Sequence, residues 1–189
     1  EKVGDIIRSE ESRRFVVPSA PGKRFDGDTK VTDLLYSCYD AAANGGDFEK
    51  VLEEIKKIGI VPVVVLDDAK DAEPLAKALC EGGLPCAEVT FRTEAAEESI
   101  RIISEKYPEM LGAGTVLTTE QVDRAVAAGA KFIVSPGFNP KIVKYCIDRD
   151  IPVTPGTQTP SEMEQAIEMG LDVVKFFPAE PAGGLKMIK

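Results

Sequence analysis

Apolar residues beyond position 60 follow two alternating patterns, separated by glycine, proline or asparagine. Short apolar runs predict β-strands over residues 61–66, 86–92, 111–116, 132–137, 152–156 and 173–178. The longer stretches between them have the spacing of amphipathic helices, which we predict near residues 71–81, 95–106, 119–128, 140–149 and 160–169. The boundary residues are typical N-caps (Thr119, Asn139, Thr159) and C-terminal stops (Gly82, Gly129, Gly170).

This succession of βα units predicts an α/β fold with a parallel sheet covered by helices. Successive strands begin 20 to 25 residues apart, and this short period favours a (β/α)8 TIM barrel. A doubly wound open sheet is the structural alternative, although no GxGxxG or Walker-type loop follows the first strand. Because the pattern ends within the sixth unit, we expect a barrel with about six of its eight units.

Two of the predicted strands carry ionisable side chains inside otherwise apolar runs. Strand alternation places Glu88, Thr90 and Arg92 on one face of the second strand. The same rule places Lys175 on one face of the last strand, between apolar neighbours. A lysine in such a position either pairs with an acid or loses its proton, and a neutral lysine is a nucleophile toward carbonyl carbon. The pattern therefore indicates an imine-forming enzyme, with a structural ion pair as the alternative.

Composition narrows the classes of function. The formal net charge of −9 and the pI of about 4.7 argue against nucleic acid or an anionic membrane as partner. No apolar run is long enough to span a bilayer and no signal pattern opens the chain, so we expect a cytoplasmic protein. The sequence has no histidine, which removes Ser-His and Cys-His nucleophile pairs and histidine-bound metals. The cysteines form no CxxC pair and predict free thiols (Cys38, Cys80, Cys86, Cys146).

Residues 49–189 resemble a known enzyme family through two long runs and three short ones. The long runs extend from Gly83 to Arg92 and from Gly170 to Gly183. The short ones stand at the ends of the third, fourth and fifth predicted strands (112–115, 135–137, 154–156). All of them resemble the 2-keto-3-deoxy-6-phosphogluconate (KDPG) and 4-hydroxy-2-oxoglutarate aldolases, which are class I, imine-forming enzymes on a (β/α)8 barrel.

The resemblance implies a reaction and a set of site residues. An aldolase of this kind would cleave KDPG or 4-hydroxy-2-oxoglutarate to pyruvate and an aldehyde, as a homotrimer and without a cofactor or metal. Lys175 would form the imine with the 2-oxo acid and Glu88 would transfer the protons. The substrate-binding residues implied are Arg92, Thr115, Pro136 and Phe177. Phosphate in TIM barrels binds after strands seven and eight, so the pattern predicts no site for a substrate phosphate.

Each of these residues also has a structural interpretation. Glu88 can serve as the ionic partner of Lys175 or Arg92. Arg92 can belong to a core ion pair, although its planar fork suits the carboxylate of a 2-oxo acid. Thr115 can satisfy backbone groups at a strand end, and Phe177 can be a core residue.

Residues 1–48 fit no βα repeat and resemble a different family. The runs 13–23 and 29–35 resemble an internal stretch of aspartate kinases, in which Thr32 matches an aspartate-contacting position, but that family's Lys-Phe-Gly-Gly nucleotide motif is absent. We therefore expect an N-terminal segment, 1–48, joined by a polar linker near 44–47 to the aldolase-like region 49–189. Aspartate kinase activity and a non-catalytic fragment or assembly scaffold are the alternative functions.

Overall fold

The computed structural model describes residues 60–107 and 110–187. The strands are β1 (Val63–Val64), β2 (Cys86–Thr90), β3 (Met110–Gly114), β4 (Phe132–Ser135), β5 (Val153–Thr157) and β6 (Lys175–Phe176). The α-helices are α3 (Ala72–Glu81), α4 (Ala96–Lys106), α5 (Thr119–Ala128), α6 (Pro140–Ile147) and α7 (Pro160–Glu168). Two short 3-10 helices complete the fold: η1 (Ala69–Asp71) and η2 (Gly184–Lys186). The predictions for residues 1–48 lie outside the described residues.

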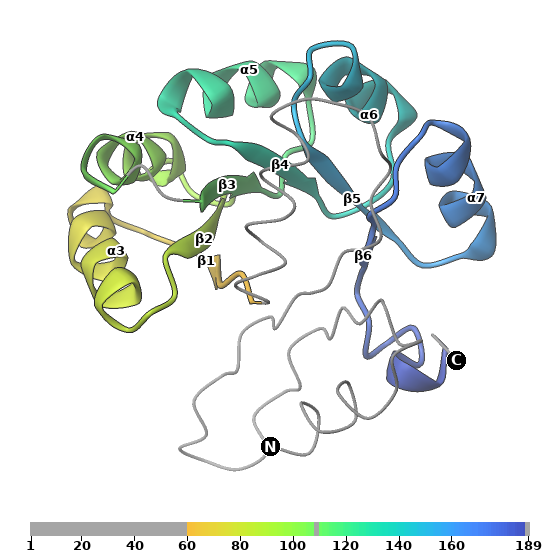
Figure 1. Ribbon diagram of the computed structural model, residues 1–189, viewed down its shortest axis with the longest axis horizontal. Coiled ribbons are helices and arrows are strands. Elements are labelled where there is room, and N and C mark those ends of the chain that lie inside the picture. The colour runs from red at the N-terminus through yellow and green to blue at the C-terminus, as the bar shows by residue number, and fades with distance from the viewer. Residues whose placement is uncertain (1–59, 108–109, 188–189) are drawn as a thin grey trace.

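The strands form one parallel sheet in the order β1-β2-β3-β4-β5-β6, which is their order along the chain. Figure 1 shows the sheet curling into an arc, with helices α3 to α7 along its convex side. A doubly wound sheet reverses its strand order and carries helices on both faces. The sequential order therefore confirms the predicted parallel α/β fold and argues against the doubly wound alternative.

The hydrophobic core lies between the helices and the convex face of the sheet. Register aligns Val89 with Ala113, and Ala113 with Ile133, across β2, β3 and β4. Side chains in one register row share a face, and these three are fully buried. They belong to one cluster with residues of α4, α5 and α6: Ile100, Val122 and Val143. Strand alternation consequently leaves Glu88 and Thr90 on the concave face.

The strand ends differ from the predicted ones at two places that matter for the site. β2 ends at Thr90, and Arg92 lies in the turn that follows. The prediction that Arg92 belongs to the strand over 86–92 was therefore wrong. The pairing stops there because Thr115, next after β3, leaves the extended conformation with φ 56°. At the last strand, β6 comprises only Lys175–Phe176 of the predicted residues 173–178.

Helix boundaries follow the predicted caps with one correction. Asn139 and Thr159 are the N-caps of α6 and α7, as predicted. The N-cap of α5 is Thr118 instead of Thr119, because the Thr118 side chain accepts a hydrogen bond from the Gln121 amide at 3.1 Å. The Gln121 side chain reciprocates by accepting from the Leu117 amide at 2.7 Å. At the carboxyl ends, Gly82 and Gly129 are the C-caps of α3 and α5, as predicted. Gly170 directly follows the C-cap of α7.

No helix within residues 60–107 and 110–187 combines the length and the hydrophobicity needed to cross a membrane.

We expect Thr118→Ala to lower the free energy of unfolding by about 1 kcal/mol, because an N-cap hydroxyl satisfies an otherwise unpaired helix amide. Thr119→Ala is the matched control, since Thr119 occupies the first helical position, where alanine is well tolerated. Urea denaturation followed by circular dichroism measures both changes. Equal losses in the two variants would contradict the assignment of the cap.

Candidate functional site

Two oppositely charged side chains meet on the concave face of the sheet. The Lys175 Nζ of β6 lies 3.6 Å from the Glu88 Oε2 of β2. Glu88 is 1% exposed and Lys175 is 7% exposed, and they are the charged residues classed as buried in the described part of the chain. The structure therefore brings together the two residues that the sequence singled out from separate strands.

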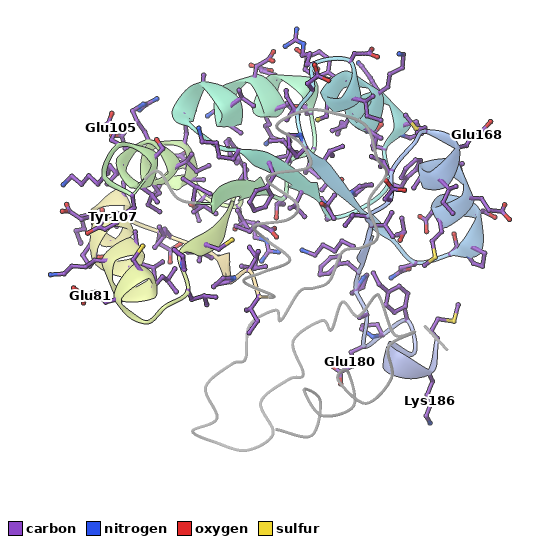
Figure 2. All side chains as sticks on the ribbon, in the orientation of Figure 1. Glu81, Glu105, Tyr107, Glu168, Glu180 and Lys186 are labelled. Atoms are coloured by element: carbon purple, nitrogen blue, oxygen red, sulfur yellow. The ribbon has the colours of Figure 1, made fainter. Side chains whose placement is uncertain are left out.

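The other carboxylates contrast with Glu88 in their surroundings. Figure 2 shows Glu81, Glu105 and Glu168 on the outside of the helical layer, where all three are exposed. A carboxylate in water needs no partner, whereas a buried one is costly unless it is paired or hydrogen-bonded. Burial thus separates Glu88 from these exposed carboxylates.

Phe177, which follows β6, lies beside this pair, and Thr90 shares the face of β2 that carries Glu88. The Lys175 Nζ lies 4.9 Å from the centroid of the half-buried Phe177 ring, which is within the range of a cation–π contact. Thr90 is fully buried, and its hydroxyl donates to the Val64 carbonyl at 3.0 Å. Thr90 therefore ties β2 to β1, while Phe177 forms a wall beside the lysine.

Glycines on β3 make room on the concave face, although we had not predicted them as site residues. A Cβ placed on Gly114 would lie 1.9 Å from the Glu88 Oε1, and one on Gly112 would lie 2.1 Å from the Phe132 ring. Both distances are far below any van der Waals contact. The detectable signal was the alternation Gly112-Ala113-Gly114, which clears one face of a strand and leaves the other apolar.

Arg92 and Thr115 lie together just beyond the carboxyl ends of β2 and β3. The Arg92 Nε donates to the Thr115 Oγ1 at 3.2 Å. Arg92 is exposed and Thr115 is half-buried. The guanidinium thus extends from a turn toward solvent, and its remaining N–H groups suit a bidentate anion.

Pro136 follows the end of β4 and is half-buried. Its carbonyl oxygen would lie 2.2 Å from a Cβ on Gly156, so β4 and β5 approach each other closely here. Gly156 is also the register partner of Lys175. The residue paired with the lysine on β5 therefore has no side chain that could cover it.

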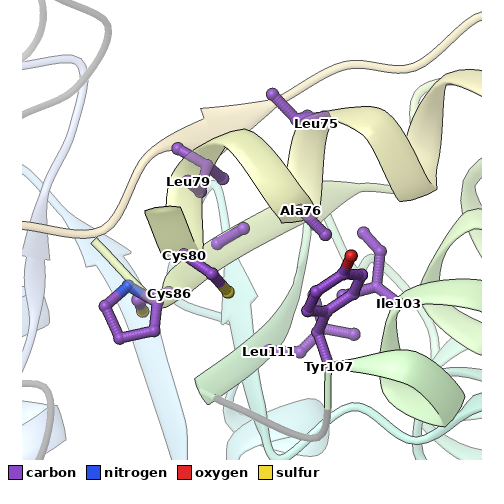
Figure 3. Close-up of a pocket in the computed structure, with 10 residues that line it drawn as sticks. Leu75, Ala76, Leu79, Cys80, Cys86, Ile103, Tyr107 and Leu111 are labelled. Atoms are coloured by element: carbon purple, nitrogen blue, oxygen red, sulfur yellow. The ribbon is translucent and has the colours of Figure 1, made fainter. Parts of the chain in front are cut away.

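An apolar cavity lies elsewhere, between α3, α4 and the first residues of β2 and β3 (Figure 3). Its labelled lining is Leu75, Ala76, Leu79, Cys80, Cys86, Ile103, Tyr107 and Leu111. Cys86 is the first residue of β2, so the cavity lies at the amino ends of the strands. Arg92, Thr115 and Pro136 follow the carboxyl ends, where α/β barrels place their chemistry. The cavity is consequently a packing feature separate from the charged pair.

Cys86 and Cys146 are buried free thiols. Burial, aided by the negative charge of Glu88, raises the pKa of Cys86 to about 12. Burial, together with Asp123, raises the pKa of Cys146 to about 12. No group of three or more possible metal-ligating histidine, cysteine or acidic side chains occurs among residues 60–107 and 110–187.

We expect Cys86 and Cys146 to resist iodoacetamide at pH 8 in the folded chain. Their raised pKa values keep them as thiols, and the thiolate is the form that reacts. Peptide mass spectrometry reads the labelling, and the same chain in concentrated urea is the control in which both residues react. Rapid labelling of Cys86 before unfolding would contradict the prediction.

Comparison with known proteins gives one consistent result. The family model described as KDPG and KHG aldolase matches residues 51–189. A 2-dehydro-3-deoxy-phosphogluconate aldolase of Haemophilus influenzae is 52% identical over 142 residues, which are 75% of this chain and 67% of that relative.

Solved structures agree with the sequence relatives. A KDPG aldolase of Legionella pneumophila, with pyruvate captured as a covalent carbinolamine intermediate, is 41% identical with a TM-score of 0.66, over 68% of this chain and 63% of that chain. The 2-keto-3-deoxy-6-phosphogluconate aldolase of Zymomonas mobilis ZM4, with 3-phosphoglycerate, is also 41% identical with a TM-score of 0.66, over 68% of this chain and 61% of that chain.

The chain thus spans about two thirds or less of the length of these relatives. Residues 1–48 precede the matched region, so their likeness to aspartate kinases and the boundary near residue 48 stay predictions.

Proposed function

Because the chain belongs to the KDPG and KHG aldolase family, we propose that it is a class I aldolase that forms an imine at Lys175. Its substrate would be a 4-hydroxy-2-oxo acid, either KDPG or 4-hydroxy-2-oxoglutarate. The products would be pyruvate and an aldehyde, namely glyceraldehyde 3-phosphate or glyoxylate. The observation that carries the proposal is the buried pair of Lys175 and Glu88 on the concave face.

The first half of the proposed reaction makes the covalent bond. The Lys175 ammonium first passes a proton to the Glu88 carboxylate, and the neutral amine then adds through its Nζ to the C2 carbonyl carbon to give a carbinolamine. Glu88 returns that proton to the carbinolamine hydroxyl, which leaves as water and yields a protonated imine. The Glu88 carboxylate, 3.6 Å from the Nζ, is close enough to exchange protons with these groups directly or through one water. The pyruvate carbinolamine of the Legionella pneumophila relative supports this step by likeness.

The second half breaks the C3–C4 bond. Glu88 accepts the proton of the C4 hydroxyl, the aldehyde leaves, and the electron pair of the broken bond moves into the protonated imine to give an enamine. The protonated Glu88 then returns its proton to C3. Water adds to the resulting imine, releases pyruvate and restores the Lys175 amine, so that the water lost earlier is regained. One carboxylate thus acts alternately as base and acid, which requires it to remain beside the imine throughout.

The remaining predicted site residues would hold the substrate. Arg92 and Thr115, joined by their 3.2 Å hydrogen bond, would receive the substrate carboxylate, because a guanidinium fork matches its two oxygens. Phe177 and Pro136 would form the walls around C2 and C3. The position of these groups after strand ends supports the proposal, because barrel enzymes build their sites at that edge.

We further propose that the curled sheet belongs to a (β/α)8 barrel, which its sequential strand order and outer helices support. The free thiols of Cys86 and Cys146 fit a reducing, cytoplasmic environment. The homotrimer implied by the family resemblance stays a prediction, which sedimentation would test.

We expect the wild-type chain to give a covalent adduct on Lys175 when pyruvate and borohydride are added together. Lys175→Ala removes the nucleophile and should abolish the adduct. Lys144→Ala is the control, because Lys144 is an exposed lysine paired with Asp148 at 2.8 Å. Mass spectrometry of the intact chain and its peptides measures the adduct.

Two results of this experiment would contradict the proposal. Full adduct formation in Lys175→Ala would place the reactive amine elsewhere. A folded wild-type chain that yields no adduct would favour the non-catalytic fragment considered as an alternative.

We expect Glu88→Gln to slow the exchange of pyruvate C3 protons with deuterium from solvent by about 10²–10⁴-fold, the usual contribution of a general acid–base. The amide keeps the size of the side chain but cannot accept the proton. Proton NMR of pyruvate in D2O measures the exchange, and slow borohydride trapping at Lys175 should persist. An unchanged exchange rate would remove Glu88 from the mechanism.

A further inference from the structure

We propose that Gly114 is a positioning residue for the aldolase reaction, because its missing side chain holds open the space in which the Glu88 carboxylate lies beside Lys175. This inference rests on the proposed function and extends it to a residue without a side chain.

A side chain at position 114 would collide with the carboxylate end of Glu88. Any Cβ at this position would meet the Glu88 Oε1 at 1.9 Å, its carboxyl carbon at 2.6 Å and its Cγ at 2.7 Å. These are the three nearest atoms, and none of them belongs to the backbone. A Cβ at this position therefore requires the Glu88 carboxylate to move.

The register of β2 and β3 explains why Gly114, and not Gly112, lies next to the Glu88 carboxylate. Glu88 pairs with Gly112 and Thr90 pairs with Gly114, so the glycines and Glu88 share the concave face. The Glu88 side chain leans along its strand direction and lies over Gly114. It is 1% exposed, so surrounding atoms leave it little room to move elsewhere.

Displacement would be costly for the reaction. The Glu88 Oε2 is 3.6 Å from the Lys175 Nζ, and a Cβ on Gly114 would demand a shift of more than an ångström at the same carboxylate. A misplacement of about 1 Å in a catalytic group can cost about 10²-fold in rate.

Other glycines of the described region are occluded by different atoms. A Cβ on Gly112 would meet the Phe132 ring, and one on Gly156 would meet the Pro136 backbone, so both serve packing. Gly137 has no atom within 4 Å of its virtual Cβ. Gly137 therefore offers a control for the same substitution in open space.

The first test is pyruvate C3-proton exchange in D2O with Gly114→Ala in the 189-residue chain. We expect the rate at saturating pyruvate to fall about 10- to 100-fold, and the half-saturating pyruvate concentration to change less than about three-fold. Gly137→Ala should exchange at the wild-type rate. An unchanged rate in Gly114→Ala would overturn the inference.

The second test asks whether Gly114→Ala lowers the exchange rate by displacing the Glu88 carboxylate. In a Glu88→Gln background the proton acceptor is already absent, so adding Gly114→Ala should reduce exchange by less than about two-fold. A merely structural effect of the alanine would reduce the rate by the same factor in both backgrounds, and that result would overturn the inference.

The third test keeps the inference falsifiable if Gly114→Ala fails to fold. Glu88→Ala removes the atoms that the new Cβ would meet, so Gly114→Ala should lower the melting temperature much less in the Glu88→Ala background than in wild type. Equal lowering in the two backgrounds would overturn the inference. Absence of both exchange and trapping in the wild-type chain would instead count against the proposed function.

Discussion

The curvature of the sheet is the constraint on which the site depends. β2 and β6 are separated by four strand intervals, which would place them about 19 Å apart in a flat sheet with the usual spacing of about 4.8 Å. Their side chains nevertheless come within 3.6 Å at Glu88 and Lys175. Only a sheet that curls toward its own concave face can join them. The difference in side-chain volume between the two faces favours this curl. Apolar side chains packed against the helices fill the convex face, whereas glycines reduce the side-chain volume on the concave face.

The same small residues link the shape of the sheet to its chemistry. Gly114 leaves space for the Glu88 carboxylate, and Gly156 stands beside Lys175 without a side chain. Thr90 ties β2 to β1 through its hydroxyl, so the strand that carries Glu88 is held on both sides. The carboxylate is thus confined by packing and does not depend on a flexible loop.

Energetics favours a functional interpretation of the buried pair over a purely structural one. Removing two charges from water costs several kcal/mol per ion, so a buried ion pair contributes little net stability compared with apolar residues of similar size. The exposed pairs on the helices, such as Lys144 with Asp148, contribute at most about 1 kcal/mol each. The fold has ample apolar core without Glu88 and Lys175, whereas an imine-forming reaction needs both groups in one sheltered place.

The sequence by itself determined the parallel α/β class, the order of the βα units and the special positions of Glu88 and Lys175. These follow from local rules: strand alternation, helix periodicity and the cost of burying a charge within an apolar run. Cap positions were predictable to within one residue, since Thr118 and Thr119 present the same hydroxyl and only the helix hydrogen bonds choose between them.

The tertiary structure alone decided what meets across the sheet. Alternation assigns Glu88 and Lys175 each to a face of its own strand, but the 3.6 Å between them depends on the curl of the whole sheet. Arg92 lies outside β2 because Thr115, which follows the neighbouring strand, departs from the extended conformation. The residues 86–92 alone could not indicate this. Gly114 matters because the side chain of Glu88, 26 residues earlier in the chain, lies against it. Such contacts join residues far apart in sequence, and a local pattern carries no information on their distance.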